Sequence, residues 1–158
     1  MDEQAKKTAL RMIPYGLYVL CTKDGEKLNA AAINWVTQAS FKPPLVAMGI
    51  KTDTDTFHNL KNGSACALSI LGTGQNDTAF AFFKPTEHAG DTINGHRYES
   101  AGNGAPVLID APAWVEGKVT DVVERGDHAV VVGEVTEAGV RRESSVLTLS
   151  ECGVFYGG

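Results

Sequence analysis

Short apolar runs, each closed by turn residues, recur along the first half of the chain. Their length and their β-branched and aromatic members predict strands at 16–22, 28–34, 45–50 and 65–71. Asp24-Gly25, between the first two runs, is a two-residue hairpin signal, so these two strands are expected to pair antiparallel. The second run carries three successive alanines, and their small side chains leave room for another group to approach that surface.

The second half of the chain predicts longer strands and few helices. Strands are expected at 113–124 and 127–137, joined by Arg125-Gly126, and at 145–149 and 153–156. Capping residues, Asn-Gly stops and following prolines predict short helices at 3–12, 53–62 and 77–83. Residues 84–106 show no regular period, so they are expected to form a long irregular loop of the kind that often carries function.

These elements follow one another without a parallel strand–helix–strand unit. The expected fold class is therefore mainly β: an antiparallel barrel of six or seven strands with a few short helices at its ends or sides. No linker, repeat or low-complexity tract divides the 158 residues. Residues 1–158 are accordingly expected to form one domain.

Composition excludes several classes of partner. The net charge is −5 and the 14 Lys and Arg are scattered, which argues against nucleic acid because phosphate binding needs a basic face. No stretch of 18 apolar residues is present, and residues 1–4 are acidic, so neither a membrane span nor a secretory signal is expected. Cys21, Cys66 and Cys152 have no paired spacing and are interpreted as reduced thiols of a cytoplasmic protein.

Familiar catalytic signatures are absent. The chain has no Gly-x-Gly-x-x-Gly after a strand, no triphosphate-binding loop and no Gly-x-Ser-x-Gly elbow. The four histidines, His58, His88, His96 and His128, do not fall at metal-ligand spacing, so no metal site is predicted. Binding chemistry has to come from polar clusters at the ends of strands.

The first such cluster is the segment from Asn34 to Ser40, which precedes Pro43-Pro44. Five of its side chains can donate hydrogen bonds at the expected end of a strand. This arrangement suits a planar heterocycle with carbonyl and ring-nitrogen acceptors. An ordinary polar exit from a strand into a loop accounts for the same residues equally well, so both interpretations stay open.

The second cluster runs from Lys51 to Thr56, where a strand ends and a helix is predicted to begin. Hydroxyls, free backbone N–H groups and the Lys51 ammonium suit an anion such as a phosphate. Capping of the helix by Asp53 or Thr54 is the commoner use of these residues, and Asp53 with Asp55 counts mildly against a bound phosphate.

The third cluster is Asp127-His128, at the tip of the long predicted hairpin. Asp127 can orient the His128 imidazole. An exposed turn with a surface histidine explains the same pair.

Taken in order, these blocks resemble the flavin reductase-like family of FMN-binding split-barrel proteins. The resemblance covers about residues 13–156 and is especially close to the domains fused to flavodiiron proteins and to rubredoxin-type electron carriers. It rests on these blocks of the chain: 13–20, 34–40 with Pro43-Pro44, 51–56 with Asn62-Gly63, 105–108, Glu116, 126–128 and 133–135.

The resemblance implies a split barrel that works as a homodimer, with FMN, or sometimes FAD, near the dimer interface and NADH or NADPH as electron donor. It implies that the flavin ring is lined by Asn34, Trp35, Val36 and Thr37, with Gln38 and Ser40 close by. It implies that the ring edge and phosphate are held by Ile50, Lys51, Thr54 and Thr56. Phe83 matches a loop close to the flavin, His128 matches a histidine at the flavin or nicotinamide face and is the catalytic candidate, and Tyr156 matches a C-terminal tyrosine without an assigned role.

Two functions follow from this resemblance, and a third competes with them. The chain is expected to be an NAD(P)H-dependent flavin reductase, or alternatively an electron-transfer flavoprotein with tightly bound FMN that exchanges electrons with a rubredoxin or flavodiiron partner. A split barrel that binds haem or nothing is the third hypothesis. It is disfavoured because the 34–40 segment offers no evident axial ligand.

Overall fold

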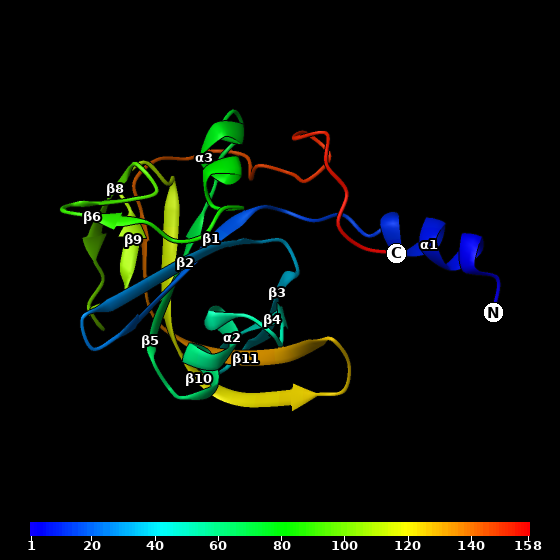
Figure 1. The fold of residues 1–158 in the computed structure, drawn as a ribbon, viewed down its shortest axis with the longest axis horizontal. Helices are drawn as coiled ribbons and strands as arrows, with labels where there is room; N and C mark the ends of the chain where they lie inside the picture. Colours follow the sequence, from blue (N-terminus) through cyan, green and yellow to red (C-terminus); the bar gives the residue numbers. More distant parts are fainter.

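A curled antiparallel sheet of seven strands forms the body of the molecule in the computed structural model, which describes residues 1–158 (Figure 1). The strand order is β2-β1-β5-β10-β11-β4-β3, and β2 and β3 are the two edges. The strands are β1 (Tyr18–Asp24), β2 (Lys27–Ile33), β3 (Val36–Phe41), β4 (Pro44–Lys51), β5 (Ala65–Ile70), β10 (Ala113–Glu124) and β11 (His128–Val140). The predicted antiparallel barrel is confirmed, and it is open between its two edge strands.

Local turn chemistry sets the pairing of neighbouring strands. The β1–β2 hairpin forms as expected, but Asp24 pairs with Lys27, so its two turn residues are Gly25 and Glu26 and not the predicted Asp24-Gly25. Gly25 has φ +57°, a backbone conformation that glycine adopts without a steric penalty. The β10–β11 pair has register shifts after Glu116 and after Val119, and such irregularities add the twist that curls a sheet.

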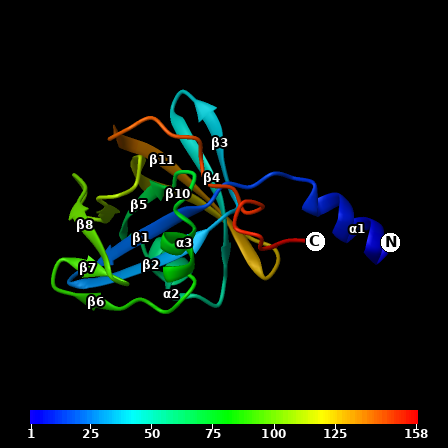
Figure 2. The ribbon, with the colours of Figure 1, turned by 90° about the horizontal axis from the view of Figure 1, so that it is seen from above.

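Three helices complete the main outline: α1 (Glu3–Arg11), α2 (Asp55–Lys61) and α3 (Asn76–Ala81). The helix α2 buries Phe57 and Leu60 in a core that includes Leu20, Ile50 and Val131 from the sheet. The helix α1 buries none of its residues and extends away from the barrel (Figure 2). None of the three helices has the length and apolar character needed to cross a membrane.

The prediction of an irregular 84–106 segment was wrong. This region contains β6 (His88–Ala89), β7 (Thr92–Ile93) and β8 (His96–Ser100), which join β9 (Pro106–Leu108) in a second, four-stranded sheet. Strands of two residues are too short to produce a period in the sequence, and their pairing depends on the turns between them.

The prediction of two closing strands was also wrong. Residues 145–149 make only the isolated bridges Gly16–Thr148 and Gly72–Val146, and no strand forms at 153–156. The segment instead returns toward the start of the chain. There Leu17 N donates to Leu147 O at 2.8 Å, and Leu149 N donates to Tyr15 O at 3.0 Å.

The polar segment 34–40 is not a loop exit, because residues 36–41 form the edge strand β3. Its partner β4 follows after a turn at Lys42-Pro43, and Val36 pairs with Met48. Most β3 side chains face solvent, which explains why the segment has a polar sequence although it is a strand.

Candidate functional site

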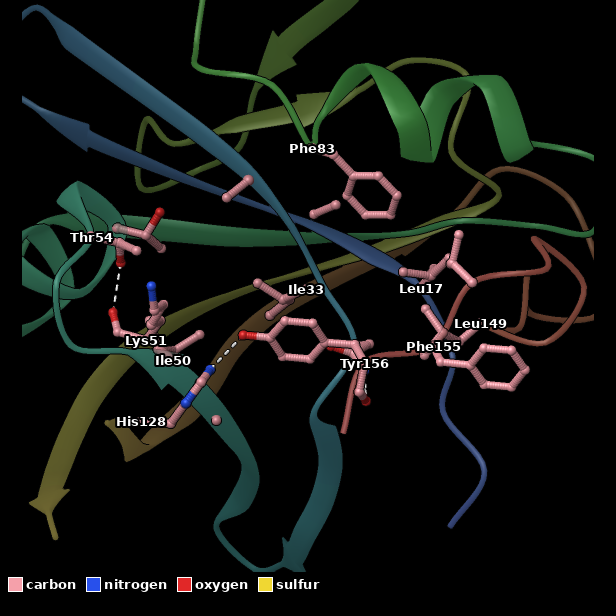
Figure 3. A pocket seen from close by; sticks show the side chains of 16 residues that line it. Leu17, Ile33, Ile50, Lys51, Thr54, Phe83, His128, Leu149, Phe155 and Tyr156 are labelled. Carbon is pink, nitrogen blue, oxygen red and sulfur yellow. Dashed lines mark hydrogen bonds between the residues drawn. The ribbon is translucent and has the colours of Figure 1, made fainter. Parts of the chain in front are cut away.

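A cavity of about 410 Å³ opens at one end of the barrel, where six separate parts of the chain meet. Its walls are Leu17 before β1, the end of β2, the end of β4 with the start of α2, Phe83 after α3, the start of β11 and the C-terminal segment. The volume is within the range of small-molecule sites. Figure 3 shows the lining side chains, with Lys51 and Thr54 at one end and Leu17, Leu149 and Phe155 at the other.

The polar end of the cavity has one cation and two hydroxyls. Lys51 Nζ lies 3.1 Å from Asp53 Oδ2, and both side chains are at least half exposed. The hydrogen bond to Asp53 raises the pKa of Lys51, so its ammonium is charged throughout the neutral range. Because the Lys51–Asp53 pair is open to solvent, an incoming anion can replace Asp53 as the partner of Lys51.

The threonines at this end are already engaged within the protein. Thr54 caps α2: its hydroxyl accepts from Phe57 N at 3.2 Å and donates to Lys51 O at 2.8 Å. Thr56 Oγ1 accepts from Asn29 Nδ2 at 2.8 Å. The capping interpretation of this cluster is therefore confirmed for Thr54. Lys51 is the group at this end whose bond can be exchanged for one to an anion.

The rest of the cavity wall is mainly apolar. Leu17, Ile33, Ile50 and Leu149 contribute aliphatic surface, and the Phe83 ring, which is half exposed, projects toward them in Figure 3. Alanines of β2 also line the cavity, as their small side chains had suggested. A flat apolar body can lie against such a wall while its charged end reaches Lys51.

A chain of three side chains connects the cavity to solvent. Tyr156 Oη lies 2.7 Å from His128 Nε2, and His128 Nδ1 lies 3.0 Å from Asp127 Oδ1. The hydrogen bond with His128 lowers the pKa of Asp127, whereas burial is the main cause that raises the pKa of Tyr156. The Trp35 ring packs against both, with its centroid 4.6 Å from that of His128 and 5.3 Å from that of Tyr156.

The structure brings together seven of the twelve residues that the sequence selected. These residues line the cavity: Asn34, Ile50, Lys51, Thr54, Thr56, Phe83 and His128. Trp35 lies behind His128 and Tyr156 rather than on the cavity wall. The remaining four, Val36, Thr37, Gln38 and Ser40, belong to β3, and the first three line a second groove on the sheet.

Sequence reasoning missed several parts of the cavity wall. Leu17, Ile33 and Leu149 looked like core residues of predicted strands, and apolar residues carry no signal that separates a cavity wall from a core. Tyr156 was noticed without a role. Its contact with His128 spans 28 positions of the chain, so no spacing rule could have found it.

Comparisons with known proteins agree with this architecture. The diflavin flavoprotein A 1 of Synechocystis is 32% identical over 143 residues, which are 90% of this chain and 25% of that protein. The flavin reductase of Pseudomonas putida is 28% identical over 159 residues, which are 100% of this chain and 91% of that protein. The chain thus spans about a quarter of the first relative and nearly all of the second.

A solved structure shares the fold. The NADH:FAD oxidoreductase SgcE6 of Streptomyces globisporus C-1027 superposes with a TM-score of 0.74 at 27% identity, covering 86% of this chain and 77% of that one. The family model described as flavin reductase like domain matches residues 10–154. Because that match spans most of the chain and includes all seven strands of the barrel, the chain belongs to the flavin reductase like domain family.

Proposed function

We propose that this chain binds FMN in the cavity and acts as an NAD(P)H-dependent flavin reductase. The observation that carries the proposal is the cavity itself, which joins an apolar wall to the exchangeable ammonium of Lys51. The flavin reductase of Pseudomonas putida, similar over the whole chain, supports the same activity. FAD is the alternative flavin, and NADH and NADPH are both candidate donors.

The residues present fit a flavin. Its tricyclic ring needs a flat apolar wall, which Leu17, Ile33 and Phe83 provide. Its phosphate needs a cation or free donors, and Lys51 is the cation on the wall. Asp53 opposes a phosphate only while it lies beside Lys51, and its exposed side chain is free to turn into solvent.

The bound flavin supplies the redox chemistry by accepting two electrons as hydride from a nicotinamide. The protein's residues bind, orient and exclude water. Lys51 balances negative charge at the polar end, and the Asn34 side chain donates to Tyr156 O at 3.5 Å. Hydride transfer needs no general base, which agrees with the absence of a catalytic triad.

The test begins with the absorbance spectrum of the protein loaded with FMN, before and after NADH is added without oxygen. Visible flavin bands that bleach support the reductase, and failure to take up FMN refutes the proposal. Lys51→Met is expected to weaken FMN binding about three- to tenfold and to leave riboflavin binding unchanged, because only FMN carries the phosphate. Lys61→Met is the matched control, since Lys61 is equally exposed, pairs with Glu124 and lies outside the cavity.

A carrier function is the second candidate. Two relatives favour the carrier function. One is diflavin flavoprotein A 1, and the other is the high molecular weight rubredoxin of Moorella thermoacetica, which is 29% identical over 89% of this chain and 62% of that protein. In that case the chain holds oxidised and reduced FMN with similar affinity and exchanges electrons with a rubredoxin or flavodiiron partner. Flavin bands that resist NADH and NADPH but bleach with a reduced partner protein would select this function.

We also propose that the chain works as a homodimer. The second groove, of about 550 Å³, exposes apolar side chains of β1, β4, β5, β10 and β11 beside the free edge of β3. Phe41, at the tip of the β3–β4 hairpin, is 86% exposed, and clustered apolar exposure of this kind marks interfaces. Phe41→Asp is expected to lower the mass measured by light scattering from dimer to monomer. Val140→Asp, at a valine that is 75% exposed and lies outside the cavity and the second groove, is expected to change nothing.

The cytoplasm is the location we propose. All three cysteines are free, which suits a reducing compartment. Fractionation of cells that express the tagged chain tests this location.

A further inference from the structure

The His128 imidazole is held from three sides. Asp127 bonds to Nδ1, Tyr156 bonds to Nε2, and the Trp35 ring packs against the imidazole. The His128 side chain is only 15% exposed, whereas that of Asp127 is 89% exposed. The ring therefore has little freedom to rotate, and both of its nitrogens have a defined partner.

When His128 is neutral, the hydrogen bonds among Asp127, His128 and Tyr156 allow only one arrangement of hydrogens. The pKa of Asp127 is lowered, so its carboxylate accepts and cannot donate. The proton of neutral His128 must then be on Nδ1, and Nε2 is left as an acceptor. Burial raises the pKa of Tyr156, so its hydroxyl keeps its proton and donates it to Nε2.

Protonation of His128 reverses the second bond. A charged imidazole carries a hydrogen on both nitrogens, so Nε2 becomes the donor and Tyr156 Oη becomes the acceptor. The hydroxyl hydrogen of Tyr156 is then free to turn toward the cavity that Tyr156 lines. The neutral state offers the cavity an oxygen lone pair at this place, and the charged state offers it a donor.

We propose that Tyr156 and His128 form a hydrogen-bond direction switch that gives the cavity a donor when its ligand gains negative charge. His128 is a positioning residue that acts through Tyr156. This inference rests on the proposed function, since reduction by hydride leaves one negative charge on the flavin ring. In this step the nicotinamide delivers two electrons and one hydrogen as hydride. His128 Nε2 takes one proton from solvent.

The surrounding charges agree with this coupling. Lys51 faces His128 directly, since the two residues pair in the β4–β11 register, and Asp127 bonds to Nδ1 of the imidazole. Asp53 and Lys51 also act on Tyr156, with opposite signs. A charged His128 is repelled by the neighbouring Lys51 ammonium. Asp127 and a negatively charged ligand together offset this repulsion, so protonation of His128 becomes favourable when the ligand is negative.

A purely structural role for Tyr156 is the competing explanation. Tyr156 O accepts from Asn34, and Gly157 O accepts from Arg11 Nε at 3.1 Å, so the C-terminal segment has other anchors besides the hydroxyl. If the hydroxyl only anchors this segment, its removal affects every ligand of the cavity equally. The switch predicts instead that its removal affects only the negatively charged form.

The first experiment uses the ligand-free protein and ¹⁵N NMR of the imidazole nitrogens. In the neutral imidazole, the switch requires the hydrogen on Nδ1 of His128, and this preference should be lost in Asp127→Asn. A hydrogen on Nε2 in the wild type would overturn the inference. This measurement does not depend on whether the protein binds flavin.

The second experiment measures dissociation constants for oxidised and reduced FMN in Tyr156→Phe. Reduced FMN should bind about tenfold more weakly and oxidised FMN less than about threefold more weakly, because a hydrogen bond to a charged group is the stronger kind. Tyr98→Phe is the matched control: its hydroxyl also bonds a histidine, His88 Nε2 at 3.0 Å, but neither residue lines the cavity. Equal losses for both forms, or none, would overturn the switch and leave the proposed function intact, whereas a wild type that binds neither form refutes the proposed function.

Discussion

Gly49 is the position where the smallest change should disturb the site most. Gly49 lies in β4, and a Cβ placed there would be 2.8 Å from Trp35 Cε3 and 3.1 Å from Trp35 Cβ. The first distance is 0.6 Å short of ordinary van der Waals contact, which begins at 3.4 Å. The second neighbour is attached to the backbone, so rotation of the ring alone does not relieve the clash.

The Trp35 ring also has little space to retreat. It packs against His128 and Tyr156, and its centroid is 6.5 Å from that of Tyr15. We expect Gly49→Ala to lower the free energy of unfolding by about 1–3 kcal/mol, the usual cost of overpacking. The displaced ring should also weaken FMN binding, because it supports two residues of the cavity wall.

The assay is urea unfolding followed by fluorescence, with Gly133→Ala as the matched control. Gly133 lies in the neighbouring strand β11, and a Cβ there would meet only Lys118 O at an ordinary 3.7 Å. Its replacement should be neutral or stabilising by a few tenths of a kcal/mol, since alanine loses less backbone entropy than glycine. If Gly49→Ala proves as stable as Gly133→Ala, the packing argument is wrong.

Two further predictions follow from the shifted pKa values. Burial raises the pKa of Cys21 to about 12 and that of Cys66 to about 11. Iodoacetamide at neutral pH should therefore label Cys152 first, which peptide mass mapping measures. Early labelling of Cys21 would contradict this prediction. The pKa of Asp127 is lowered by its bond with His128, so this contact stabilises the fold above the ordinary carboxyl pKa of about 3.9 and loses its effect as the pH falls through the lowered value. The difference in unfolding free energy between wild type and Asp127→Asn should therefore shrink below about pH 4, and a constant difference would refute the assignment.

The barrel was largely predictable because its signals are local. The glycine of the β1–β2 turn and the Arg125-Gly126 link between β10 and β11 act within a few residues, and these strands formed where expected. The strand β3 was missed because an edge strand exposed to solvent has a polar sequence that resembles a loop. The small sheet of β6 to β9 was missed because its strands are too short to show a period.

The candidate site was predictable only in part. Lys51 and Thr54 were found because a strand end followed by capping residues is a recognisable pattern, and the structure showed that the cap engages the Thr54 hydroxyl. The role of Tyr156 could not be found in this way, since the residue carries no motif and meets His128 through the path of the C-terminal segment.

The sequence by itself determined that β1, β2, β4, β5, β10 and β11 are strands and that a cation is available after β4, because turn geometry and strand propensity depend on neighbouring residues. Only the tertiary structure decided that β5 pairs with β10 and that the C-terminal segment lies against Leu17 and Asn34. It alone placed Asp127, His128 and Tyr156 in one hydrogen-bonded chain. Contacts between distant residues depend on how the whole sheet curls. The free energy of that packing comes from the whole core, so no single segment of the sequence determines it.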